Sequence, residues 1–233
     1  MTVRRAPLLL VIAALALALS LVAGCGGGGD DSAAADGTIQ QLKIAYTSGG
    51  TSSTADTWNL KGAADAASRS RVLDGGQVTS DIALSDGFLA VWTPESGQVI
   101  SAPAQAAVSP DPFALADGLV EDGTLTAAGT VTRDGKELKA YTGPPDAFLL
   151  SGTEGTVTAA GAKVRYLRDE AAGRPVELRI PAASVAPKGG QAAQVPAQRF
   201  VVTGFRQYPA TEKAMEVFDL SAIYDGTGTT TTP

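Results

Sequence analysis

Alternating apolar and polar residues mark the middle of the chain as β-structure. The even positions of residues 77–84 share one face if the segment is extended, because successive side chains of a strand point to opposite sides. An Asp-Gly pair follows at 86–87, and residues 88–92 alternate again, with Phe88 and Trp92 on one face. Asp-Gly between two alternating runs is typical of a tight hairpin turn. The pattern therefore predicts two antiparallel strands.

Similar short runs recur along the chain. A second Asp-Gly pair at 134–135 predicts another hairpin. The predicted strands cover residues 38–47 (a strand or a short helix), 77–84, 88–92, 98–101, 125–133, 137–142, 162–168, 175–180 and 199–205. Short strands at this spacing indicate an antiparallel meander, in a sandwich or a barrel. We find no internal repeat.

One segment, residues 109–123, has the features of a helix. Asp111 precedes Pro112, and both residue types are favoured where a helix begins. The apolar residues that follow, from Phe113 to Val120, supply a face that can pack on a sheet.

The first residues resemble the export signal of bacterial lipoproteins. Arg4 and Arg5 precede an apolar stretch, which ends in small residues directly before Cys25, as in a lipobox. This predicts cleavage before Cys25 and acylation of its thiol, which places the protein on the extracytoplasmic face of the cell membrane. The alternatives are an ordinary secretory signal or an uncleaved membrane-spanning anchor, since about 20 apolar residues suffice to cross a bilayer.

Composition divides the rest of the chain. We expect a signal peptide at 1–24, a flexible Gly/Ala tether at 25–37, one domain at 38–225 and a disordered Gly/Thr tail at 226–233.

Charge and residue counts exclude several functions. The formal net charge is −6, which disfavours a nucleic-acid partner because phosphates repel an acidic surface. The chain has no histidine and one cysteine, which excludes internal disulfides, Cys/His zinc sites and histidine-based nucleophilic catalysis. No cofactor motif and no paired carboxylates for acid/base chemistry are recognisable. We therefore expect a protein without metal or cofactor that is not an enzyme.

Two kinds of charged pair are expected on the solvated surface. Arg69 and Arg71 share a face if their segment is a strand. Such a pair could bind an acidic partner or a lipid head group, but we expect it to lie on a solvated strand face. The acidic pairs at 121–122 and 169–170 fall in predicted turns, and the pair at 30–31 in the tether. Solvent exposure is the expected state of each.

The order of the segments resembles the LolA-like superfamily. Residues 85–94 (SDGFLAVWTP) join a strand, an Asp-Gly turn and a strand with Trp and Pro; a hairpin at 133–136 follows. Residues 166–178 then combine Tyr, Asp and Gly-x-Pro before another strand, and a last strand closes at 205–209. The superfamily includes periplasmic lipoprotein carriers, the mycobacterial LppX and LprG lipoproteins and the RseB sensor domain.

The resemblance implies a fold and a function. The implied fold is mainly β, a curved antiparallel sheet (a half-barrel) covered on its concave side by short helices, with an apolar cavity between sheet and helices that receives acyl chains. It implies a binder or carrier of a lipid or another hydrophobic ligand; the alternatives are an envelope sensor that binds a protein partner and a structural lipoprotein without ligand. The candidate cavity residues are Val78, Ile82, Leu84, Phe88, Trp92, Tyr166, Val176, Leu178, Ile180 and Phe205. Each is equally compatible with an ordinary core position, because apolar residues are usually buried.

Overall fold

The computed structural model of the chain describes residues 37–63, 67–104, 111–150 and 154–224. Cys25, the signal peptide, most of the tether and the tail at 226–233 lie outside the described residues, so their predictions are not tested by it.

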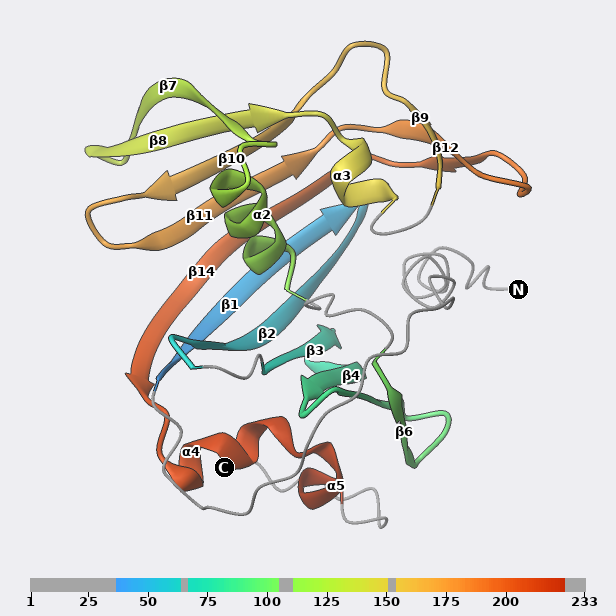
Figure 1. The fold of residues 1–233 in the computed structure, drawn as a ribbon, viewed down its shortest axis with the longest axis vertical. Helices are drawn as coiled ribbons and strands as arrows, with labels where there is room; N and C mark the ends of the chain where they lie inside the picture. Colours follow the sequence, from blue (N-terminus) through green and yellow to red (C-terminus); the bar gives the residue numbers. More distant parts are fainter. Residues whose placement is uncertain (1–36, 64–66, 105–110, 151–153, 225–233) are drawn as a thin grey trace.

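A large antiparallel sheet dominates the fold (Figure 1). Its strands are β1 (Thr38–Ser48), β2 (Thr51–Lys61), β3 (Ser68–Asp74), β4 (Gln77–Ser85), β5 (Phe88–Trp92), β6 (Val99–Pro103), β7 (Thr126–Arg133), β8 (Lys136–Gly143), β10 (Val164–Asp169), β11 (Arg174–Ile180) and β14 (Gln198–Pro209). They lie in the order β6-β5-β4-β3-β2-β1-β14-β11-β10-β8-β7, so β6 and β7 form the two open edges. A second sheet of three strands contains β9 (Gly155–Thr158), β12 (Ala183–Pro187) and β13 (Ala193–Val195).

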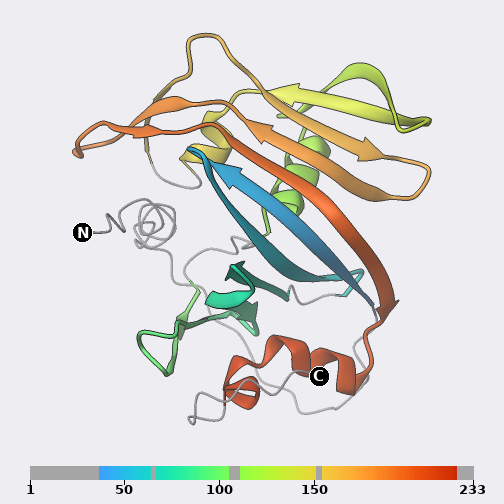
Figure 2. The same cartoon turned by 180° about the vertical axis from the view of Figure 1, so that it is seen from behind.

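The large sheet curves strongly and does not close into a barrel (Figures 1 and 2). Bulges, which bend a strand and increase its twist, interrupt its ladders at three inserted residues, Thr79 in β4, Val176 in β11 and Thr203 in β14. The pairing of β7 with β8 is also irregular, between Ala127 and Thr130. The predicted mainly β fold with a curved sheet and short helices is confirmed.

Helices pack on both faces of this sheet. Helix α2 (Pro112–Glu121) lies inside the bend, over β11, β14 and β1, whereas α4 (Glu212–Met215), η1 (Glu216–Phe218) and α5 (Leu220–Ile223) lie on the outer side, next to β3 and β4 (Figure 1). The short helix α3 (Asp146–Leu149) follows β8. The resemblance implied helices on the concave face; this is correct for α2 and wrong for the C-terminal helices.

The local signals in the sequence explain several of these elements. Asp86 and Gly87, and likewise Asp134 and Gly135, all have positive φ values of 51–75°, which is the geometry of a two-residue hairpin turn. Helix α2 begins where predicted: the carboxylate of Asp111 accepts the backbone N–H of Phe113 at 2.9 Å, and Pro112 is the first helical residue.

Candidate functional site

The concave face of β2–β6 carries no charged side chain over its central rows. Residues directly opposite one another on antiparallel strands point to the same side. One such row runs from β1 to β6 through Leu42, Thr57, Ser70, Ile82, Val91 and Ile100. The next row contains Gln40, Asn59, Ser68, Leu84, Leu89 and Ala102. We call these two rows the concave surface; its hydroxyls and amides lie on β1–β3, and its aliphatic residues, except Leu42, lie on β4–β6. The residues of β1–β3 are buried, so the solvent-accessible part of the concave surface lies on β4–β6.

Two hydroxyls of the concave surface are buried and lack a hydrogen-bond partner. Thr57 is fully buried and Ser68 is 5% exposed, and neither Oγ has a partner. A buried polar group without a partner costs about 1–3 kcal/mol. At the other end of the surface Ile100 is 64% exposed, so an apolar side chain there faces solvent.

Helix α2 covers the neighbouring part of the concave face and packs directly on it. Phe113 and Ala116 of the helix join a cluster with Leu42, Tyr166 and Leu178, each at most 1% exposed. The Tyr166 hydroxyl donates to Asp117 at 2.6 Å, which ties the helix to β10. Burial and the nearby charge of Asp117 raise the pKa of Tyr166.

A buried carboxyl group lies where α2 meets the concave surface. Asp111 is 1% exposed, and it also accepts a hydrogen bond from the side-chain amide of Asn59. Burial raises the pKa of Asp111 to about 6, although the hydrogen bonds from Phe113 and Asn59 and the charge of Lys61 oppose this; the charge of Asp117 adds to it.

Six of the ten candidate cavity residues lie on the concave face. Ile82 and Leu84 belong to the concave surface, and Tyr166, Leu178, Ile180 and Phe205 lie beneath α2. The structure therefore places these six in two adjoining areas. Whether any of them contacts a ligand stays a prediction.

The other four candidates lie on the convex side. Val78 and Trp92 pack with α5, Val176 packs with Leu138 and Leu167, and Phe88 is 51% exposed. Val78 was expected to share a face with Ile82, but the bulge at Thr79 moves it to the opposite side. The alternation of apolar residues in the sequence does not reveal a one-residue insertion of this kind.

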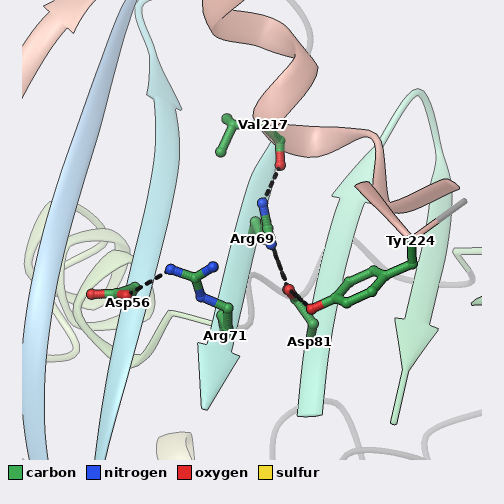
Figure 3. Close-up of polar contacts among 6 residues, drawn as sticks. All are labelled: Asp56, Arg69, Arg71, Asp81, Val217 and Tyr224. Atoms are coloured by element: carbon green, nitrogen blue, oxygen red, sulfur yellow. Dashed lines mark hydrogen bonds and ion pairs between the residues drawn. The ribbon is translucent and has the colours of Figure 1, made fainter. Parts of the chain in front are cut away.

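Four charged side chains of β2–β4, Asp56, Arg69, Arg71 and Asp81, lie on the convex side and are paired there (Figure 3). Arg69 binds Asp81 through Nε at 2.8 Å and Nη2 at 2.5 Å, and its Nη1 donates to the Val217 carbonyl at 2.9 Å. The Tyr224 hydroxyl donates to the same carboxylate at 2.7 Å. The side chains of Arg69 and Asp81 are 2% and 0% exposed, so the network holds the C-terminal helices on the sheet.

Arg71 continues this network beside Arg69. It binds Asp56 at 3.0 Å, and both guanidinium groups lie over the ring of Trp58, at 4.8 Å for Arg69 and 5.3 Å for Arg71. The expected solvated pair of arginines is therefore wrong, although the two do share a face. The sequence did not show that three helical segments cover this face.

The expectation for residues 169–170 is wrong for Asp169 and correct for Glu170, which is exposed. Asp169 is 7% exposed and pairs with Arg174 at 3.4 Å, and Glu170 accepts the Tyr141 hydroxyl at 2.5 Å. The Asp169–Arg174 pair thus closes the β10–β11 hairpin, and Glu170 ties the hairpin to β8. The pair at 121–122 is exposed as expected.

A groove of about 720 Å³ opens elsewhere, between the ends of β7 and β8, helix α3 and β9. Small and hydroxyl side chains line it, among them Thr126, Thr142, Gly143 and Thr156, with Asp146 and Lys163 as its charged groups. None of the ten candidate residues lines this groove.

In the part of the chain that the structure describes, no group of three or more acidic or cysteine side chains is placed to hold a metal ion. In the same ranges, every helix is too short or too polar to cross a bilayer.

Comparison with known proteins gives structural similarity only. No family model and no curated protein match the chain. An uncharacterized conserved protein from Thermus thermophilus is 13% identical, with a TM-score of 0.45, over 78% of this chain and 85% of that one. MucB, in its complex with MucA from Pseudomonas aeruginosa, is 17% identical, with a TM-score of 0.42, over 76% of this chain and 54% of that one.

A third match is the LolA superfamily protein from Nitrosomonas europaea, 10% identical, with a TM-score of 0.29, over 78% of this chain and 90% of that one. The solved structures similar to this chain thus include a LolA superfamily protein, the group that the order of its segments resembles.

Proposed function

We propose that the protein is a lipid-anchored, extracytoplasmic binding protein that receives an amphiphilic ligand on the concave surface. Acyl chains on Cys25 would hold it on the membrane, where two or more chains give stable attachment. The domain would then act by binding rather than by catalysis.

The distribution of charge between the two sides of β2–β6 carries this proposal. Asp56, Arg69, Arg71 and Asp81 all lie on the convex side and form two ion pairs there. The concave surface offers only aliphatic, hydroxyl and amide groups. An aliphatic chain gains about 0.8 kcal/mol for each methylene that it moves from water onto apolar groups, and a surface without charge demands no desolvation of ions.

The two unpartnered hydroxyls indicate the polar part of the ligand. Thr57 and Ser68 are buried, so a ligand would reach their hydroxyls only after the side chains that cover them move; the hydroxyls could then donate to or accept from an ester, an amide or a hydroxyl. The aliphatic residues begin one strand further along, at Ile82 and Leu84. A ligand with an uncharged polar group near β2–β3 and an aliphatic chain over β4–β6 fits this order.

Two neighbouring residues of the edge strand provide a direct test. Ile100 lies on the concave surface, opposite Val91, and Ser101 lies on the convex side, opposite Ala90. Both are exposed, so neither substitution should affect folding. We expect Ile100→Glu to weaken binding of a pyrene-labelled monoacylglycerol about 10- to 100-fold, which corresponds to loss of one buried aliphatic side chain. Fluorescence titration measures this.

Ser101→Glu is the matched control, because it adds the same charge one residue away and should leave the affinity unchanged. Equal loss in both variants, or no loss in Ile100→Glu, would contradict ligand binding on the concave surface. Extraction of the membrane-purified protein with organic solvent, followed by mass spectrometry, identifies the native ligand. The same mass spectrum reports whether Cys25 is acylated.

A further inference from the structure

Three arginines stand directly opposite one another on the convex side of the sheet. Arg165 on β10 pairs with Arg179 on β11, and Arg179 pairs with Arg199 on β14. Figure 2 looks onto this side of β10, β11 and β14. Like charges directly opposite across a ladder destabilise a sheet. The positive charges of this row must therefore be neutralised by acidic groups, or they serve a function.

One buried carboxylate supplies most of the compensation, and the exposed Asp134 adds a second partner for Arg133 at 3.8 Å. Glu177, whose side chain is 2% exposed, accepts from Arg133 at 2.5 Å, from Arg199 at 3.1 Å and from Nε of Arg179. Burial alone would raise the pKa of Glu177, but the hydrogen bonds from Arg199, Arg179 and Arg133 outweigh it and lower the pKa to about 2. Three guanidinium groups thus share one acid, and they remain 36–54% exposed.

The positive charge continues along the sheet toward the start of the domain. The side chain of Lys43 lies across Gly204, and Arg206 stands opposite Gln41 on the same side. Both cations are exposed, and no ion pair is found for Arg165, Lys43 or Arg206 among the described residues. We call Lys43, Arg133, Arg165, Arg179, Arg199 and Arg206 the arginine face.

The C-terminal helices on the same side of the sheet have the opposite charge. Glu212, Glu216 and Asp219 are exposed there, against one cation, Lys213. The convex side is therefore electrically asymmetric, with a basic sheet and an acidic helical end, in a chain whose net charge is −6. A negatively charged surface would attract one end and repel the other, which fixes an orientation.

We propose that the arginine face docks the domain on an anionic lipid surface. This rests on the lipid anchor of the proposed function, because the anchor keeps the domain next to a bilayer. Thr38, where the domain begins, pairs with Pro209, only three residues beyond Arg206. Arg199, opposite Thr47, lies about 30 Å further along the strands.

The tether is long enough for this contact. About a dozen residues separate Cys25 from Thr38, which reach about 40 Å when extended. Docking through the convex side would leave the concave surface turned away from the bilayer.

Vesicle binding tests the proposal. The chain from residue 25 onward with Cys25→Ser, which lacks no part of the described sheet, is mixed with vesicles of equal parts phosphatidylglycerol and phosphatidylcholine, or of phosphatidylcholine alone. We expect co-sedimentation with the anionic vesicles only. Binding should decrease as the ionic strength rises from about 0.01 M to 0.15 M, since the Debye length falls from about 30 Å to about 8 Å.

Two double variants with equal loss of charge locate the contact. Arg165→Gln with Arg206→Gln should reduce the vesicle affinity roughly 30-fold, at about fivefold per charge. Lys188→Gln with Lys213→Gln removes two exposed cations outside the arginine face and should leave it unchanged.

Equal sedimentation with both kinds of vesicle, no sedimentation with either, or equal effects of the two double variants would overturn the proposal. Failure here is distinct from failure of ligand binding. The monoacylglycerol titration uses no vesicles, and Arg165 and Arg206 lie on the opposite side of the sheet from Ile100.

Discussion

Replacing Arg69 by alanine should lower the free energy of unfolding by about 3–5 kcal/mol, because it leaves the carboxylate of Asp81 buried without its charge partner. The same change removes the hydrogen bond to the Val217 carbonyl, which joins the C-terminal helices to β3. Asp81→Ala should cost a similar amount, since it strands the buried guanidinium and also removes the acceptor of the Tyr224 hydroxyl. Urea unfolding measures both.

The fluorescence of the two tryptophans is a suitable readout for this experiment. Trp58 lies beneath the guanidinium groups of Arg69 and Arg71, and Trp92 stacks on Tyr224 with ring centroids 4.1 Å apart. Both indoles therefore report on the contact between the sheet and the C-terminal helices. If that contact is lost before global unfolding, the tryptophan fluorescence will change at a lower urea concentration than the circular dichroism of the backbone.

Arg71→Ala provides the matched control on the same strand. The side chains of Arg71 and Asp56 are 17% and 16% exposed, so water screens this pair and replaces part of the lost contact. We expect a cost of about 1 kcal/mol. The double variant Arg69→Met with Asp81→Leu should recover most of the stability lost in either single change, because no unpaired charge remains buried. Equal costs for Arg69→Ala and Arg71→Ala would show that burial does not set the strength of the pair.

The elements that the sequence predicted are those whose signals are local. The Asp-Gly turns at 86–87 and 134–135, the strands that flank them and the start of helix α2 at Pro112 need only a few adjacent residues to form. The sequence predicted either a strand or a short helix for residues 38–47, and the segment is strand β1.

The elements that were missed depend on distant parts of the chain. Strand β3 (SRSRVLD) has no apolar face in its first four residues, so its sequence does not indicate a buried strand. Its arginines can nevertheless be buried, because Asp56 and Asp81 neutralise them and helices more than a hundred residues later cover them. Strand β2, with TSSTADT at its start, is polar for a related reason: one side contributes Thr57 and Asn59 to the concave surface. Hydrophobic patterning assumes that buried means apolar, and these strands bury paired charges and hydroxyls.

The same limit explains the candidate site. Alternation placed Ile82 and Leu84 correctly on one face, but the bulges at Thr79 and Val176 move Val78 and Val176 to the other side. Thr57 and Ser68 were not candidates, because isolated hydroxyls in a polar stretch give no signal. Only the register of β2 with β3 shows that these hydroxyls adjoin the aliphatic residues.

Stability should pass through a maximum between about pH 4 and 5, because two buried carboxyl groups titrate in opposite directions. The pKa of Asp111 is raised to about 6 in the folded protein, from 3.8. Between these values the folded state keeps a proton that the unfolded state has lost, so stability falls as the pH rises through this window, by up to about 3 kcal/mol. Glu177 acts in reverse: with its pKa lowered from 4.5 to about 2, its contribution is complete above pH 4.5 and is lost as the pH falls toward 2.

Single substitutions separate the two sides of this maximum. Asp111→Asn removes the titrating proton but keeps a side-chain oxygen that can accept the N–H of Phe113, so the helix start is preserved. The decline of the unfolding free energy from pH 4 to 6 should then disappear. Glu177→Gln should instead flatten the rise between pH 2 and 4.5, which amounts to about 1–2 kcal/mol, since the arginines around it are partly exposed. Urea unfolding from pH 2 to 7 gives both slopes. If the unfolding free energy of Asp111→Asn still declined between pH 4 and 6, another group would be the one that titrates in this window. Asp111 of the unmodified protein would then stay charged at the start of α2, beside Asn59 and the concave surface.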